Sequence, residues 1–381
     1  MNKPERLLSL DVFRGITICL MIVVNNPGSW EYVYGPLRHS AWHGCTPTDL
    51  VFPFFMFIMG TAMWYSFKKY GSRISKGISI KILRRTGLIF LIGLALNAYA
   101  VYSLEWSSLR IMGVLQRIAL AYGVSSFIVV GVSAKNPGIG SGISSGLRTG
   151  IITGIILVGY WAILLAFGGE NPFSLEGNFV SRFDIRLLGA GHVPVFHGVK
   201  FDQTGLLSTL PSIGNVLIGY LAGSLIDGSG NKMDAVKKLL AFGIAGIALS
   251  LLWSLVFPIN KPLWTSTFVL FTSGLSMACL GILLWIIDIK GKSRWTMPFQ
   301  VFGMNPLSIY VLSILLAITF RIVFIPSGEG ALLSVTGWLF GGFFEPLAGS
   351  MFGSLLYALT MTAFCWFVGW LLFRRRIFIK I

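Results

Sequence analysis

Long apolar runs separated by short polar segments dominate the chain. A membrane-spanning helix needs about 20 predominantly apolar residues, and runs of about that length recur from end to end. They cover residues 11–27, 48–67, 82–99, 111–133, 149–168, 206–226, 237–257, 264–287, 297–324 and 349–373. The pattern therefore predicts an all-α polytopic membrane protein with about ten transmembrane helices, which form a single transmembrane domain over residues 1–381.

One further apolar segment, residues 331–347, is shorter, rich in glycine and interrupted by Glu345 and Pro346. Lys and Arg residues gather on the cytoplasmic side of membrane proteins. With ten spans, 21 of the 30 Lys and Arg residues share a side with both termini, and six lie opposite. This distribution predicts cytoplasmic N- and C-termini and large outside loops at 28–47 and 169–205. An eleventh span would place Arg374, Arg375 and Arg376 outside, so segment 331–347 is predicted to be re-entrant or interfacial.

Composition supports the membrane assignment and excludes other classes. Of 381 residues, 55% are hydrophobic and only 12% are charged, about half the charged fraction of a soluble domain. The net charge of +16 would suggest nucleic acid in a soluble protein. Here the basic residues lie in clusters between apolar runs, so no nucleic-acid partner is expected. The four cysteines form no CxxC pair and no Cys/His ligand spacing, so no metal site is predicted.

Ionisable residues inside predicted spans are costly and need a reason. Asp11 and Arg14 are three residues apart and therefore share a helix face. They form either a local ion pair or an anion contact in which Asp11 orients Arg14. Arg117 has no oppositely charged neighbour within its own span. We expect it to meet Asp11, Asp49 or a ligand phosphate.

Two predicted spans are interrupted by asparagine and proline. Asn25-Asn26-Pro27 ends the first span, and Asn305-Pro306 breaks the ninth. Broken helices within a membrane are tolerated only where they line protein or a cavity. Asn25 and Asn305 are therefore either candidate site residues or internally satisfied kinks.

The first outside loop carries candidate catalytic chemistry. His39 and His43 lie in the segment His-Ser-Ala-Trp-His-Gly, between Asn25 and Asp49. Histidine is the usual general base near neutral pH. Asp49 begins the second span, where it either caps the helix or orients a histidine. No HExxH or Walker motif occurs, which argues against the corresponding metallohydrolases and against ATP-driven transport.

Several sequence blocks together resemble one known family. They are SLDVFRG (9–15), HSAWHG (39–44), DLVFPFFMFIMG (49–60), GVLQRI (113–118), FDQTGLLSTLP (201–211), NKPLWT (260–265) and GMNPL (303–307). The chain is similar to the heparan-α-glucosaminide N-acetyltransferase family and looks like a short bacterial-type member. The resemblance implies transfer of an acetyl group from cytosolic acetyl-CoA to the amine of a terminal glucosamine across the membrane. It also implies an integral protein of the bacterial cytoplasmic (inner) membrane and suggests a homodimer.

The resemblance implies roles for individual residues. The reactive histidine of the family matches His39, and its nearby asparagine matches Asn25. His39 then acts as general base or takes the acetyl group itself. Asn25 donates a hydrogen bond to the thioester oxygen, and Asp49 holds the tautomer of His39. His43 receives no role.

The donor substrate would be held elsewhere in the bundle. Arg14 and Arg117 are expected to meet the phosphates of CoA, and Asn305 is expected to contribute to the same site. The acceptor is an amino sugar or oligosaccharide that the sequence does not specify. The membrane lipid is the remaining expected partner.

Two other functions are compatible with these patterns. A sugar or lipid-linked sugar transporter or flippase would also need broken helices and a buried arginine such as Arg117. A membrane O-acetyltransferase would use the same donor and a hydroxyl acceptor. A transporter would move its substrate without acyl transfer, which distinguishes it from an acetyltransferase. An O-acetyltransferase would form an ester, which mild base removes, whereas an N-acetyltransferase would form a base-stable amide.

Overall fold

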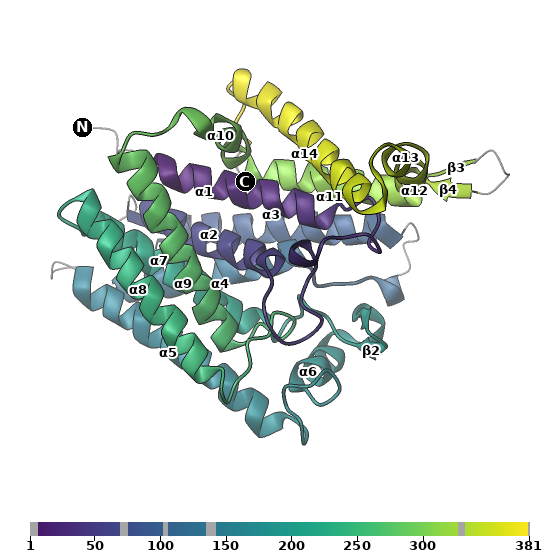
Figure 1. The fold of residues 1–381 in the computed structure, drawn as a ribbon. Coiled ribbons are helices and arrows are strands. Elements are labelled where there is room, and N and C mark those ends of the chain that lie inside the picture. Colours follow the sequence, from purple (N-terminus) through teal and green to yellow (C-terminus); the bar gives the residue numbers. More distant parts are fainter. Residues whose placement is uncertain (1–6, 69–74, 102–105, 135–141, 327–331, 380–381) are drawn as a thin grey trace.

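The computed structural model describes residues 7–68, 75–101, 106–134, 142–326 and 332–379, and most of them are helical (Figure 1). The long helices are α1 (Leu8–Asn25), α2 (Val51–Phe67), α3 (Lys76–Val101), α4 (Val114–Ala134), α5 (Gly142–Phe167), α7 (Thr209–Asp227), α8 (Lys232–Trp253), α9 (Ser266–Leu283), α11 (Pro306–Ile322) and α14 (Ser350–Arg374). The short helices are α6 (Phe179–Leu188), α10 (Met297–Met304), α12 (Val335–Leu339) and α13 (Glu345–Ala348). The strands are β1 (Val195–Phe196), β2 (Val199–Lys200), β3 (Phe324–Pro326) and β4 (Leu332–Ser334), which form two antiparallel hairpins.

The all-α polytopic membrane class is confirmed. Within the described residues, eight helices are long and apolar enough to cross a membrane, and a bent pair of helices raises the number to nine. The predicted run 82–99 lies within α3, a helix of 26 residues that packs against α4. α3 is not among the nine because its first half carries Lys81, Arg84 and Arg85.

The predicted run 297–324 is not a single straight span. α10 and α11 meet at Asn305 with a bend of 74°. Pro306 begins α11, and a proline both lacks an N–H donor and disfavours helical geometry in the residue before it. The consequence is that α10 packs along α1, while α11 continues through the bundle.

Two segments between the long helices contain regular secondary structure. Loop 169–205 folds into the ten-residue helix α6 and the β1–β2 hairpin. Segment 331–347 forms β4, α12, a π-helical turn (Phe340–Phe344) and the start of α13. No helix in the described part of this segment reaches the length of a span, in accord with a re-entrant or interfacial segment.

The contact between α2 and α7 anchors the bundle beside the candidate site. Gly60 and Gly219 face the opposite backbones, where a Cβ atom would lie 1.9 Å from the carbonyl oxygen of Val216 and 2.0 Å from that of Phe57. Small residues let helices in a membrane approach this closely. The close packing fixes α2, and the turn that leads into this helix carries a catalytic candidate.

Candidate active site

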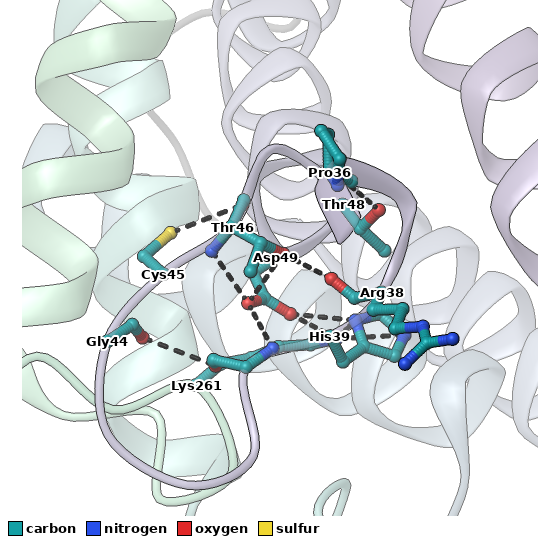
Figure 2. Close-up of polar contacts among 10 residues, drawn as sticks. Pro36, Arg38, His39, Gly44, Cys45, Thr46, Thr48, Asp49 and Lys261 are labelled. Atoms are coloured by element: carbon teal, nitrogen blue, oxygen red, sulfur yellow. Dashed lines mark hydrogen bonds and ion pairs between the residues drawn. The ribbon is translucent and has the colours of Figure 1, made fainter. Parts of the chain in front are cut away.

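Asp49 is the central acceptor of the site. It lies in a 3₁₀ turn (Pro47–Leu50) that leads into α2, and its side chain is fully buried. Its Oδ2 atom accepts hydrogen bonds from the backbone N–H groups of Thr46 (2.9 Å) and Ser40 (3.1 Å). Its Oδ1 atom lies 2.7 Å from Nδ1 of His39 (Figure 2). Asp49 therefore both caps the start of the helix and contacts His39, so capping and contact with a histidine are not mutually exclusive.

Lys261 completes a three-residue cluster that the sequence reasoning missed. Its Nζ atom lies 3.1 Å from Oδ1 of Asp49 and 2.8 Å from Nδ1 of His39 (Figure 2). Burial lowers the pKa of the Lys261 ammonium below its ordinary value, although the Asp49 carboxylate opposes this shift. The sequence block NKPLWT (260–265) contains Lys261 and could have pointed to it. In the charge distribution this lysine was counted only as one of the positive charges on the outside of the membrane.

The loop that carries Lys261 is joined directly to the histidine loop. The backbone N–H of Gly44 donates to the carbonyl of Ile259 (2.8 Å), and the side-chain amide of Asn260 lies 3.3 Å from Nδ1 of His43. Burial lowers the pKa of His43. This residue contributes to the junction between the two loops, and the geometry gives it no catalytic role.

His39 opens into a cavity of about 160 Å³, which we call the histidine cavity. Its lining comprises Met21, Val24, Asn25, His39, Thr48, Val51, Phe52, Val114, Gln203, Thr204, Lys261, Trp264 and Tyr310. Among the described residues, the side-chain polar groups of Asn25, Gln203 and Tyr310 have no hydrogen-bond partner. Polar groups at the wall of a cavity that are not paired internally can bind a ligand.

A second cavity, of about 600 Å³, is strongly basic, and we call it the basic cavity. Its cationic lining residues are Arg14, Lys81, Arg84 and Arg85, and no Asp or Glu is among the described residues that line it. The remaining lining is mainly apolar and comes largely from α2, α3 and α4. Clustered Lys and Arg side chains of this kind suit a phosphate-bearing ligand.

The two cavities lie in line between the same helices, α1, α2, α4 and α11. On α2 the lining passes from Phe52 in the histidine cavity to Phe55 in the basic cavity, and on α4 from Val114 to Ile118. Neighbouring lining residues are thus about one helical turn apart. At a rise of 1.5 Å per residue, the lining from residue 51 to residue 66 of α2 covers roughly 22 Å. The linings of the two cavities therefore approach each other along α2 and α4.

Arg14 lies where the sequence placed it. It lines the basic cavity, and its guanidinium lies 3.2 Å from Oδ1 of Asp11, so the predicted ion pair forms. The same guanidinium donates to the carbonyl of Gly303 at 3.4 Å. Asp11 and the α10 backbone therefore orient a cation at the cavity wall.

Arg117 and Asn305 contact other parts of the protein and line neither cavity. Arg117 is fully buried against the Trp264 ring, where it contacts Ser208 and the carbonyl of Gly205, and it lines neither cavity. The amide of Asn305 is taken up by the backbone of Ile377 and Ile379. Arg117 thus braces a loop and Asn305 holds the C-terminal segment, while their expected contacts with CoA remain predictions.

The fold and the site define a class: a polytopic membrane protein with a His-Asp-Lys cluster at one end of a bundle and a basic cavity further along it. The family model described as "Heparan-alpha-glucosaminide N-acetyltransferase, catalytic" matches residues 6–251. The human and mouse proteins named heparan-alpha-glucosaminide N-acetyltransferase are each 30% identical to this chain over 81% of its length, which covers 52% and 53% of the relatives. The chain belongs to this family and spans about half the length of these relatives.

Proposed function

We propose that this protein transfers the acetyl group of acetyl-CoA to the amine of a glucosamine-type sugar. The observation that carries the proposal is the His39–Asp49 pair, which opens into a cavity in line with a basic one. The name of the relatives supports the reaction class.

The basic cavity would hold the donor. Arg14, Lys81, Arg84 and Arg85 provide positive charge for the phosphates of CoA. The pantetheine arm would extend between α2 and α4 and bring the thioester beside His39. The distribution of Lys and Arg supports a cytoplasmic donor end, with the acceptor entering from the opposite side of a bacterial inner membrane.

The chemistry follows from the protonation of the amine. A sugar amine must lose a proton before it attacks the thioester carbon. If Nδ1–H of His39 donates to Asp49, Nε2, which lies 3.4 Å from Nζ of Lys261, would take that proton. The new C–N bond forms, the C–S bond breaks, the imidazolium returns its proton to the CoA thiolate, and the new amide nitrogen releases its remaining extra proton to solvent. Asn25 lines the same cavity and would donate to the thioester oxygen as charge develops.

An alternative uses the same geometry. His39 could attack the thioester and carry the acetyl group before the amine takes it. Incubation with radiolabelled acetyl-CoA without acceptor separates the two routes. Acetyl label retained on wild-type protein and absent from His39→Ala favours the acetyl-enzyme route, and its absence from both favours direct transfer.

The test of the proposed function incubates the purified protein with acetyl-CoA and glucosamine and follows free thiol and product mass. We expect His39→Ala to lower kcat by a factor on the order of 10²–10⁴. The matched control is His197→Ala, which replaces an exposed histidine of the β1–β2 hairpin turn and keeps wild-type turnover. A base-stable product identifies an amide, whereas an ester indicates O-acetylation.

Two results would contradict the proposal. One is a His39→Ala variant with wild-type turnover. The other is a wild-type protein that forms no product and is not protected against heat by acetyl-CoA. The second result would favour the transporter.

A further inference from the structure

Gln203 stands on a turn whose neighbouring residues are all held in place. Asp202 accepts hydrogen bonds from Nε (2.9 Å) and Nη2 (2.6 Å) of Arg110. It also accepts from the backbone N–H (2.8 Å) and hydroxyl (2.9 Å) of Thr204. A bidentate Arg–carboxylate pair fixes direction as well as position. The residues on both sides of Gln203 are therefore rigidly oriented.

The residues that follow Gln203 in the chain are also held by contacts with buried charged side chains. Arg117 donates to the carbonyl of Gly205 at 3.4 Å, and the backbone N–H of Leu207 donates to Oδ1 of Asp184 at 3.0 Å. Gly205 lies so close to Asp184 that a Cβ atom would be 1.8 Å from Oδ2. The buried Arg117 therefore helps to hold the loop that forms one wall of the histidine cavity.

Gln203 differs from its neighbours in this turn. Its side chain lines the histidine cavity with His39 and Lys261, and it has no hydrogen-bond partner among the described residues. The rigid turn fixes the backbone from which this side chain reaches the cavity, so ligand binding needs to order only the side chain itself. Its amide both donates and accepts, as does a sugar hydroxyl.

The position of Gln203 favours the acceptor over the donor. None of the described residues that line the basic cavity comes from this loop, although α1, α2, α4 and α11 contribute residues to both cavities. A cationic amine would be better matched by a carboxylate, and the carboxylate of the His39 cluster, Asp49, already receives Lys261 and backbone N–H groups. A neutral hydroxyl is therefore the better match for the Gln203 amide.

We propose that Gln203 hydrogen-bonds a ring hydroxyl of the acceptor and thereby selects sugar amines over amines without hydroxyls. This inference rests on the proposed acetyl transfer. It assigns Gln203 as a specificity-determining residue beside the catalytic His39.

The experiment compares glucosamine with cyclohexylamine, which carries an amine on a six-membered ring without hydroxyls. Gln203→Met keeps the length of the side chain and removes the amide. We expect its KM for glucosamine to rise roughly tenfold, while KM for acetyl-CoA and kcat/KM for cyclohexylamine stay at wild-type values. The control is Gln300→Met on α10, which loses one hydrogen bond to Thr296 (2.8 Å) outside both cavities. It keeps all three parameters.

The outcomes separate this inference from the proposed function. An unchanged glucosamine KM in Gln203→Met overturns the role of Gln203, and so does an equal loss for both amines, which would indicate a role in shaping the cavity. Equal heat protection by acetyl-CoA in both proteins shows that the variant is folded. If the wild-type protein acetylates no amine, the proposed function fails first, and the assignment of Gln203 fails with it.

Discussion

The two cavities share four helices but use charge in opposite ways. In the basic cavity Arg84 and Arg85 are exposed and lie at a wall without described acidic residues. In the histidine cavity Asp49 is fully buried and is paired with Lys261 and His39. Exposed cations are available to an incoming anion and are screened by salt. Buried, paired charges interact with each other and not with an incoming ion. In the histidine cavity their effect is to orient His39.

The same contrast extends beyond the cavities. Near the histidine cavity, Asp202 is buried and paired with Arg110, and the side chains of Arg117 and Asp184 are buried beside them. Buried pairs contribute little net stability, but breaking one is costly. We therefore expect substitutions near the histidine cavity to change kcat or folding, and substitutions in the basic cavity to change the binding of the donor.

The largest expected effect is that of Asp49→Asn. An amide in place of the carboxylate no longer favours the tautomer with hydrogen on Nδ1 of His39, and we expect kcat to fall by a factor of about 10²–10⁴, as for the loss of a well-placed general base. The KM for acetyl-CoA should stay near wild type because the proposed site for the CoA phosphates is the other cavity. Steady-state kinetics with both substrates varied provides the measurement. A kcat equal to that of wild type would show that His39 does not depend on this carboxylate.

The second effect concerns the basic cavity. Arg84→Ala and Arg85→Ala should each raise KM for acetyl-CoA by about tenfold and leave KM for glucosamine unchanged, because each removes one charge from a phosphate site. Arg148→Ala is the control, since Arg148 is a basic residue of α5 that does not line the cavity.

Ionic strength and a shortened donor sharpen this test. The wild-type KM for acetyl-CoA should rise with added salt, and the two variants should show a weaker dependence. S-acetylpantetheine, which lacks the nucleotide, should be used equally well by wild type and variants. A loss of activity with this short donor would mean that the substitutions damage the bundle and do not act through the phosphates.

Sequence periodicity and local motifs predicted the parts of the site that depend on short separations. Asp11 and Arg14 are three residues apart, and His39 and Asp49 are ten residues apart on one loop and the turn that follows it. Both pairs form in the structure. The roles of His39, Asn25 and Asp49 in the reaction remain predictions, although the histidine cavity brings His39 and Asn25 together.

Long-range contacts could not be derived in this way. Lys261 is separated from His39 by 222 positions, and nothing in its local sequence specifies that the two loops join. The intramembrane position of Arg117 showed that it needs compensation, but its contacts with Ser208 and the Trp264 ring depend on tertiary packing. The proline at position 306 revealed a break in the ninth span, but neither the 74° angle nor the contact of α10 with α1 could be derived from it.

The smallest effect tests the buried charges near the histidine cavity. Burial raises the pKa of Asp184 to about 6, against an opposing contribution from Arg117. Between about pH 4 and pH 6 the folded protein retains a proton that the unfolded chain has lost, so this contribution favours the fold at low pH and is lost as the pH rises through 6. Asp184→Asn does not titrate and keeps a side-chain oxygen for the N–H of Leu207.

Relative to wild type, Asp184→Asn should gain a few degrees in Tm between pH 4 and pH 7. Thermal unfolding in detergent across this range provides the measurement. Asp234→Asn, at the exposed start of α8, is the matched control and should show no such gain with pH. A constant difference in Tm at all pH values would mean that Asp184 does not change its protonation in this range. The N–H of Leu207 and the charge of Arg117 would then together offset the burial of the carboxylate.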